Sequence, residues 1–381
     1  MKFVLATLGS RGDVEPYAAV GRELQRRGHG VCLGVPPSYL GFVESVGLAA
    51  VPHGENLVRK FGMMPNPISV MWEIVRDVTQ FWPEVATALT SLADGADLLL
   101  VDPSQQGLAA NVGEYYDIPL ATLHFYPIEP GVADWDITKE AEDAHRRALG
   151  LPEKTGPSTP QWLEIQAYDE LFFPGLAAEW SKHGLRRPFV GGLTLQLPVE
   201  ADDEVASWIA AGTPPIYFGF GSVRVSSPAE VIAIIAAACA QLGERALICS
   251  GASDFTGIPT SDHVKIVGSV NHSAIFPACR AVVHHGGPGT TFAGIRAGKP
   301  TLILWVSVDQ PMWAAAVAQL EIGAGRPFFQ TTQKALVADL RSILTPHCAA
   351  RTREVAAQMT APAESAAAAA DLLEDAARRG R

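Results

Sequence analysis

Cysteine is scarce in this sequence, and its placement argues against two common kinds of site. The five cysteines among 381 residues are scattered along the chain, and no CxxC pair occurs. Zinc sites and disulfide frameworks need several cysteines at short, regular spacings. The sequence therefore predicts reduced thiols in a cytoplasmic protein, with neither a metal site nor a disulfide framework.

Positively charged residues are fewer than negatively charged ones. Lys and Arg total 29 against 40 Asp and Glu, which gives a net charge of −11. Such a surface repels the phosphates of nucleic acids and the anionic headgroups of membranes. We therefore expect no nucleic-acid partner. A local basic patch for transient contact with a membrane surface stays open, and so does the oligomeric state.

Long apolar runs are missing as well. No uninterrupted apolar segment reaches the roughly 20 residues that a transmembrane helix needs. The chain enters an apolar strand directly after Met1 and Lys2, so we expect no signal peptide. The composition, 48% hydrophobic and 18% charged, is that of a globular protein, and 381 residues suit two domains.

What the sequence does contain is an alternation of short apolar runs with amphipathic stretches. Residues 2–8 predict a buried strand, 9–13 a loop and 14–27 a helix. Two more strands follow within residues 31–51, which makes a doubly wound α/β half-sheet. The same alternation resumes at Ile216, after a Gly-, Arg- and Pro-rich connection.

The most informative stretch is AVVHHGGPGTTFAGIRAGKPTLILWVSVDQP, residues 281–311. It predicts a strand, a glycine-rich loop, a helix from near Thr290 and a second strand over 301–306, which is a βαβ unit. Ligands of open α/β sheets bind outside the carboxyl ends of the strands. Both the HHGGPGTT loop and the pair Asp309 and Gln310 fall at such ends.

The loop has the chemistry of an anion site. Glycines allow close backbone approach, and a helix N-terminus offers free N–H groups and partial positive charge. The Lys-Ser/Thr of a Walker A loop and the spacing of the dinucleotide fingerprint are both missing. The other interpretation is a tight turn that happens to be glycine-rich. The predicted donors are the ring of His285, the backbone at Gly287 and Gly289, and the hydroxyls of Thr290 and Thr291.

Asp13 is the candidate catalytic residue of the N-terminal half. It follows the first predicted strand at the start of a helix, where a carboxylate can act as a general base. Spacing alone equally favours a carboxylate that merely caps the helix. The neighbouring Arg11 can position Asp13 or bind an anion.

The combination of HHGGPGTT, RAGKP and DQP resembles the nucleotide-sugar signature of family 1 glycosyltransferases. With GSRGDVEP it resembles the bacterial branch that glycosylates glycopeptide antibiotics and mycobacterial glycopeptidolipids. The similarity extends over nearly the whole chain and is weakest over residues 126–163. It implies the α/β GT-B fold, in which two Rossmann-like domains face each other across a crevice. The implied division is an acceptor-binding domain (1–190), a nucleotide-sugar domain (191–360) and a C-terminal helix (361–381) that returns to the first domain.

The resemblance also implies residue roles. Asp13 serves as base in an inverting, metal-independent transfer, which tips the balance away from a simple helix cap. His284 is structural, and Ser222 either meets the phosphates or is a turn residue. The implied sites are Ser10, Arg11, Ser222, His285, Gly287, Gly289, Thr290 and Thr291 for the diphosphate, Asp309 and Gln310 for the sugar, Val270 and Ala293 near the base and ribose, and His124 and Phe125 in the acceptor pocket.

Ala293 bears on the donor. Relatives that use UDP-sugars carry a glutamate at the matching position, where it bonds both ribose hydroxyls. Alanine cannot do so, which favours a TDP-sugar and a deoxysugar such as rhamnose; no other cofactor is expected. The implied acceptors are lipopeptides, glycolipids or natural products. Two alternatives stay open, a non-catalytic sugar-nucleotide-binding protein and a nucleotide-sugar epimerase of the same fold.

Overall fold

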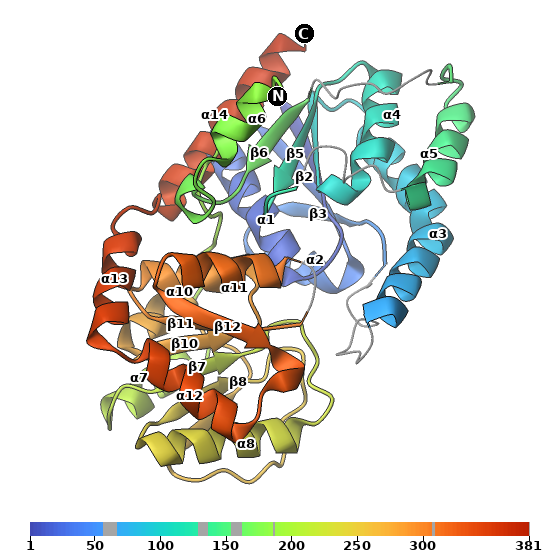
Figure 1. The fold of residues 1–381 in the computed structure, drawn as a ribbon. Helices are drawn as coiled ribbons and strands as arrows, with labels where there is room; N and C mark the ends of the chain where they lie inside the picture. The colour runs from blue at the N-terminus through green and yellow to red at the C-terminus, as the bar shows by residue number, and fades with distance from the viewer. Residues whose placement is uncertain (56–66, 129–135, 154–161, 186, 307–308, 381) are drawn as a thin grey trace. The chain divides into compact units, whose positions relative to one another are not determined.

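The protein divides into two compact units in the computed structural model, which describes residues 1–55, 67–128, 136–153, 162–185, 187–306 and 309–380 (Figure 1). Within these residues, the first unit takes in the chain up to Leu195 and again from Thr360 onward. The second unit runs from Gln196 to Met359.

The first unit is built on a six-stranded parallel sheet. Its strand order, β3-β2-β1-β4-β5-β6, is the doubly wound order, in which the chain reverses direction across the sheet between β1 and β4. The predicted α/β class is thereby confirmed. The strands are β1 Lys2–Ala6, β2 Gly30–Val35, β3 Ala49–Pro52, β4 Leu98–Val101, β5 Leu120–His124 and β6 Leu163–Gln166.

The two central strands of this sheet are buried on both faces. Phe3, Val4 and Leu5 of β1 and all four residues of β4 have no exposed surface. Continuous apolar strands of this kind are typical of parallel sheets covered by helices. The helices of the first unit are α1 Arg11–Arg26, α2 Leu40–Ser45, α3 Pro67–Leu92, α4 Gln106–Tyr116, α5 Asp136–Ala148, α6 Leu176–Lys182 and α14 Pro362–Arg379, with 3-10 turns η1 Pro37–Tyr39, η3 Pro103–Gln105 and η4 Glu170–Phe172.

The second unit repeats the same topology. Its parallel sheet has the order β12-β11-β10-β7-β8-β9, so the reversal falls between β7 and β10. Helices α10 and α11 lie on one face of this sheet, and α8 and α12 on the other (Figure 1). The strands are β7 Ile216–Gly219, β8 Ala246–Cys249, β9 Val264–Val267, β10 Ala281–His284, β11 Thr301–Trp305 and β12 Gly323–Pro327.

The helices of the second unit enclose a core centred on Phe218, Ile248, Val283 and Leu302. These side chains point to one face of the four central strands, where α8 and α12 cover them. The helices are α7 Asp202–Ala210, α8 Pro228–Leu242, α9 His272–Ile275, α10 Pro288–Arg296, α11 Gln310–Gln319, α12 Gln333–Ile343 and α13 Pro346–Ala356, with 3-10 turns η5 Phe276–Ala278 and η6 Phe328–Gln330.

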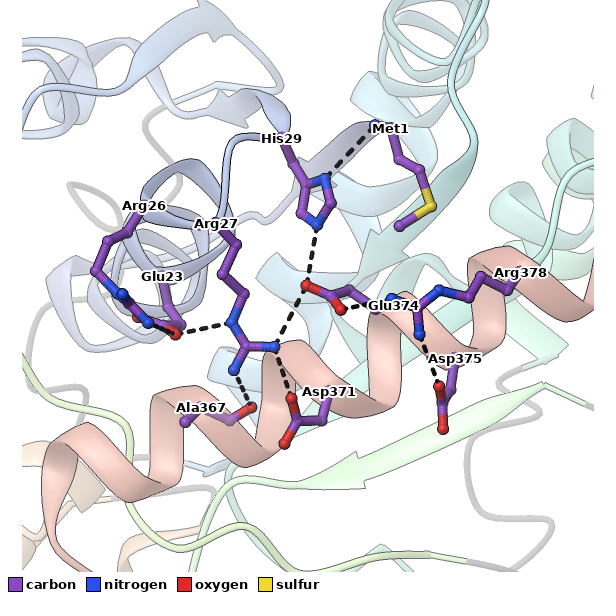
Figure 2. A network of polar contacts seen from close by, with 10 residues as sticks. All are labelled: Met1, Glu23, Arg26, Arg27, His29, Ala367, Asp371, Glu374, Asp375 and Arg378. Carbon is purple, nitrogen blue, oxygen red and sulfur yellow. Dashed lines mark hydrogen bonds and ion pairs between the residues drawn. The ribbon is translucent and has the colours of Figure 1, made fainter.

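The last helix, α14, packs against α1 of the first unit. Arg27, which follows α1, donates from Nη1 to Asp371 at 2.6 Å and from Nη2 to the carbonyl of Ala367 at 3.1 Å (Figure 2). Beside it, Nε2 of His29 lies 2.9 Å from a carboxylate oxygen of Glu374. The polar contacts tie α14 to the end of α1, and Ala369, Ala370, Leu373 and Ala377 of α14 are buried.

Several expected boundaries were wrong. α1 begins at Arg11 and not at residue 14, because Ser10 caps it and the expected loop forms its first turn. α10 begins at Pro288, two residues before Thr290, because proline suits the first helical position. The sequence also gave no sign of β12, whose glycines and proline carry no apolar signal. The other unexpected elements are β6, α6, α7 and α13.

Candidate functional site

Asp13 stands in the first turn of α1, at the carboxyl end of β1. The backbone N–H of Ser10 donates to Oδ2 of Asp13 at 2.6 Å, and the hydroxyl of Ser10 donates to the same oxygen at 2.9 Å. Gly9 allows this approach, because its φ is +106° and a Cβ there would lie 2.5 Å from Oδ2. The capping bonds therefore exist, and both of them end on Oδ2, which leaves Oδ1 for another partner.

The surroundings of Asp13 favour its neutral form. Burial is the largest cause that raises the pKa of this carboxyl, from 3.8 to about 6, and the charge of Asp102 acts in the same direction. The two bonds from Ser10 oppose the rise without cancelling it. A carboxylate with a pKa near 6 is ionised at neutral pH and still basic enough to take up a proton in a transition state.

Asp102, which the sequence analysis missed, follows β4, the neighbour of β1 at the chain reversal. Its Oδ2 accepts from the backbone N–H of Leu8 at 3.0 Å and from Nε2 of Gln105 at 2.5 Å. The side-chain oxygen of Gln105 in turn lies 2.6 Å from Nε2 of His53, which follows β3. The sequence feature that could have identified Asp102 is its position directly after a buried strand. Asp13 was identified from a similar position, at the start of the helix that follows a buried strand.

The two residues expected in the acceptor pocket are placed differently from each other. His124 is 1% exposed at the end of β5, and burial lowers its pKa to about 3, so the ring is neutral and packed inside the unit. Phe125 packs edge-on against Tyr17 of α1, with ring centroids 6.1 Å apart. The hydroxyl of Tyr17 is buried without a hydrogen-bond partner among the described residues, and burial, Asp102 and Asp13 all raise its pKa.

In the second unit, His285 begins the glycine-rich loop at the carboxyl end of β10. Its ring is wedged between two glycines. A Cβ on Gly221 would lie 2.7 Å from Cε1 of the ring, and one on Gly287 would lie 2.7 Å from Nε2. Any larger residue at Gly221 or Gly287 would displace the ring. The two glycines therefore leave the space that the ring occupies in this orientation.

The ring of His285 is neutral at physiological pH. Burial lowers its pKa to about 4, and a contact with the backbone carbonyl of Gly219 only partly opposes that shift. Its Nδ1 is buried and makes no hydrogen bond within the described part of the chain. Buried polar atoms without a partner are uncommon, and a bound ligand is one way to satisfy them. His284 is fully buried, and its Nδ1 accepts a bond from the N–H of Gly286 at 3.0 Å, while its Nε2 makes no hydrogen bond within the described part of the chain.

The N-terminus of α10 follows at once. Gly287 is its N-cap and Pro288 its first residue. Proline has no N–H, so the free backbone donors of the first turn belong to Gly289 and Thr290. Thr291 differs from the expectation, because it is buried and its hydroxyl donates to the carbonyl of Gly287 at 3.0 Å. That hydroxyl is committed to the helix.

Asp309 and Gln310 lie beside the same loop, at the start of α11. Asp309 occupies the N-cap position, but its side chain makes no capping bond. The side-chain oxygen of Gln310 accepts from the backbone N–H of Val306 at 2.8 Å, and its Cβ faces Gly286. Ser222 stands in the turn after β7, next to Gly221 and therefore near His285.

Val270 and Ala293 border one apolar cluster of the second unit. Val270 is 7% exposed within the cluster, and the partly buried Ala293 packs against it. Their assignment to the base and ribose of a donor stays a prediction. Across the described residues, no group of three or more His, Cys, Asp and Glu side chains is arranged to hold a metal ion. No helix in that part of the chain is long and apolar enough to cross a membrane.

Two family models match the chain. Residues 3–97 match the glycosyltransferase family 28 N-terminal domain, and residues 239–375 match the erythromycin biosynthesis protein CIII-like C-terminal domain. The first match covers β1 from Phe3 onward and all of α1, and it ends before β4; the second covers the glycine-rich loop. Asp13 and the glycine-rich loop therefore both lie within matched segments, whereas Asp102 does not.

The chain is also similar to individual proteins along its whole length. It is 55% identical to an uncharacterized glycosyltransferase of Mycobacterium tuberculosis, with all of both chains covered. It is 29% identical to the vancomycin aglycone glucosyltransferase of Amycolatopsis orientalis, covering 100% of this chain and 98% of that protein. Among solved structures, a spinosyn rhamnosyltransferase complexed with thymidine diphosphate gives a TM-score of 0.70 at 21% identity, covering 95% of this chain and 98% of that one.

Proposed function

Because the chain belongs to the glycosyltransferases with the GT-B fold, we propose that it transfers a sugar from a nucleotide diphosphate donor to an acceptor hydroxyl, with inversion and without a metal ion. The observation that carries the proposal is Asp13. Its carboxyl has a pKa of about 6, one oxygen is held by Ser10, and the other accepts no hydrogen bond from the residues that the structure describes, which is what a general base needs.

In the proposed reaction, Oδ1 of Asp13 takes the proton of the acceptor hydroxyl as the hydroxyl oxygen attacks the anomeric carbon. The new C–O bond forms while the bond from that carbon to the diphosphate oxygen breaks. The leaving diphosphate keeps the electron pair and gains negative charge. A single displacement inverts the configuration, so an α-linked donor gives a β-linked product and a β-linked donor an α-linked one.

The glycine-rich loop would stabilise the charge on the leaving group. Nδ1 of His285 lacks a partner among the described residues and would donate to the diphosphate in the tautomer that carries the ring proton on Nδ1. The first turn of α10 offers the N–H groups of Gly289 and Thr290. Donors already fixed in place act at full strength when charge develops in the transition state. Further proposed contacts to the diphosphate come from the backbone of Gly287 and the side chains of Ser222, Thr290, Ser10 and Arg11, with Thr291 holding the loop.

The donor is proposed to be a TDP-sugar. Asp309 and Gln310 at the start of α11 would bond the hydroxyls of the transferred sugar. Ala293 would face the deoxyribose of the nucleotide, which has no 2′-hydroxyl. An unpaired buried hydroxyl costs about 1–3 kcal/mol, so alanine disfavours a ribonucleotide. A structural neighbour complexed with thymidine diphosphate, a rhamnosyltransferase by name, supports TDP and a deoxysugar such as rhamnose.

The acceptor is proposed to be a hydroxyl of a lipopeptide, a glycolipid or another natural product. A relative named for the vancomycin aglycone and a neighbour complexed with the spinosyn aglycone support this class. The aromatic pair of Phe125 and Tyr17 lies on the same helix and strand end as Asp13 and His124. Both rings are buried, so the pair would support the wall of an acceptor pocket from inside the unit.

The test is a transfer assay with the purified protein. TDP-rhamnose or UDP-glucose is offered with lipid and natural-product extracts, and products are followed by mass. We expect a mass gain of one deoxysugar with TDP-rhamnose, unchanged by a chelator. Strict dependence on added magnesium or manganese would overturn the metal-independent mechanism. Nucleotide binding without transfer or donor hydrolysis would indicate a binding protein, and interconversion of the donor sugar would indicate an epimerase.

A further inference from the structure

Glu15 is the charged residue of the GSRGDVEP motif that the proposed reaction leaves without a role. It lies one turn into α1, four residues after Arg11, and its side chain is 22% exposed. Its carboxylate uses both oxygens. Oε2 accepts from Nε of Arg11 at 2.9 Å, and Oε1 accepts from the backbone N–H of Leu195 at 2.9 Å.

The first of these bonds orients Arg11. The guanidinium of Arg11 also lies over the ring of Phe42, with its central carbon 3.6 Å from the ring centroid. One edge of the guanidinium is thus held by Glu15 and one face by Phe42. Its terminal nitrogens Nη1 and Nη2 donate to no other residue in the described part of the chain. An arginine fixed in this way presents its free N–H groups in one direction.

The second bond reaches the point where the chain leaves the first unit. Leu195 is the last residue of that unit before Gln196 begins the second. Residues 191–199 form no helix or strand, so the N–H of Leu195 depends on Glu15 for its hydrogen bond. A single carboxylate therefore links the side chain of Arg11 to the backbone at the exit of the unit.

We propose that Glu15 is a positioning residue that pre-orients Arg11 for the donor diphosphate and couples that orientation to the chain at Leu195. The proposal rests on the role that the proposed function gives to Arg11. A free arginine loses much rotamer entropy when it binds an anion, and an arginine already held loses less. An exposed ion pair between residues i and i+4 orders a side chain weakly. The bond to Leu195 and the contact with Phe42 are what make this pair stronger.

Two substitutions separate the two bonds. Glu15→Gln keeps an oxygen for the N–H of Leu195 but loses the charge that holds Arg11, whereas Glu15→Ala loses both. We expect Glu15→Gln to weaken TDP binding about 3- to 10-fold with unchanged deuterium uptake at Leu195. We expect Glu15→Ala to weaken binding as much and to speed exchange at Leu195. The control is Asp143→Asn, which breaks the exposed ion pair of Lys139 and Asp143 on α5.

Arg11→Ala completes the test, which uses TDP titration and hydrogen exchange on the full chain. In an Arg11→Ala background, Glu15→Gln should weaken TDP binding no further. If Arg11→Ala weakens binding and both Glu15 variants behave like Asp143→Asn, the role of Glu15 is overturned. If Arg11→Ala leaves TDP binding unchanged, the assignment of Arg11 to the diphosphate fails first, and the inference about Glu15 fails with it.

Discussion

The two units have one strand order and opposite chemistry at the place where it reverses. In the first unit, two carboxylates follow β1 and β4, Asp13 in the first turn of α1 and Asp102 directly after β4, and the charge of Asp102 raises the pKa of Asp13. In the second unit, β7 and β10 end in glycines and the neutral His285, followed by the N-terminus of α10. The same sheet topology thus carries carboxylates that can accept a proton in the first unit and hydrogen-bond donors in the second.

This difference shows how a doubly wound sheet is adapted to a task. The strand ends supply position in both units, and the residues that follow supply the chemistry. In the second unit, Gly287 and Pro288 begin a helix whose first turn carries the N–H groups that we propose bind the donor diphosphate. In the first unit, packing around Asp13 changes the basicity of a single side chain. Substitutions in each unit should therefore separate these two contributions.

Asp13→Asn should give the largest loss, because an amide cannot take a proton from the acceptor. We expect kcat to fall by about a hundredfold or more at saturating donor. Folding should be preserved, since the side-chain oxygen of Asn can still accept from Ser10. The measurement is steady-state transfer, with Asp117→Asn at the exposed end of α4 as control. Near-normal turnover of Asp13→Asn would remove Asp13 from the role of base.

His285→Ala should weaken the interaction with the donor and leave the general base unchanged. The lost donor and the space left between Gly221 and Gly287 should weaken nucleotide diphosphate binding and slow turnover, together by about 10- to 100-fold. The control is His347→Ala, an exposed histidine of α13. Turnover and donor KM that match this control would show that the ring does not contact the donor.

The pH profile should report the environment of Asp13. The protonated carboxyl cannot act as base, so kcat/KM should fall about tenfold per pH unit as the pH drops through about 6. An ordinary aspartate, with a pKa of 3.8, would keep its activity to near pH 4. Because Asp13→Asn has no carboxyl at this position, its residual activity should lack this acid limb. A wild-type profile that is flat from pH 7.5 to 5 would contradict the raised pKa.

Ala293→Glu should produce the smallest effect, a change in nucleotide preference. A glutamate on α10 can bond both ribose hydroxyls, so the ratio of TDP to UDP affinity should shift towards UDP by roughly fivefold or more. The control is Ala297→Glu, one turn further along and beside the same apolar cluster. A clear preference of the unaltered protein for UDP would refute the argument from Ala293.

Sequence reasoning succeeded where the signal was local. The glycine-rich loop and its flanking strands were contained in residues 281–311, and the family resemblance was carried by short motifs there and in residues 9–16. A relative with 55% identity confirms the resemblance. The sequence did not predict the network of Asp102, Gln105 and His53. Asp102 and Gln105 follow β4, and His53 follows β3; these strands become neighbours of β1 and β2 only in the folded sheet. Pairing between distant strands is not written in a local pattern.

Two further limits are smaller in scale. The start of α1 was misplaced because Gly9 to Asp13 is typical of a loop, whereas the bonds of Ser10 and Asp13 turn it into a capped first turn. The hydroxyl of Thr291 was expected to face a ligand, yet a threonine can equally bond the carbonyl four residues earlier. The choice between these depends on burial, which the fold decides.

The most direct test of these separate roles for Asp13 and His285 is to titrate Asp13→Asn and His285→Ala with TDP in parallel, by calorimetry. The account predicts that Asp13→Asn binds TDP within about twofold of the unaltered protein although it has lost transfer. It predicts that His285→Ala binds at least about tenfold more weakly. Equal weakening in both variants, or unchanged binding in His285→Ala, would contradict the assignment of the base to Asp13 and of the principal diphosphate contact to His285.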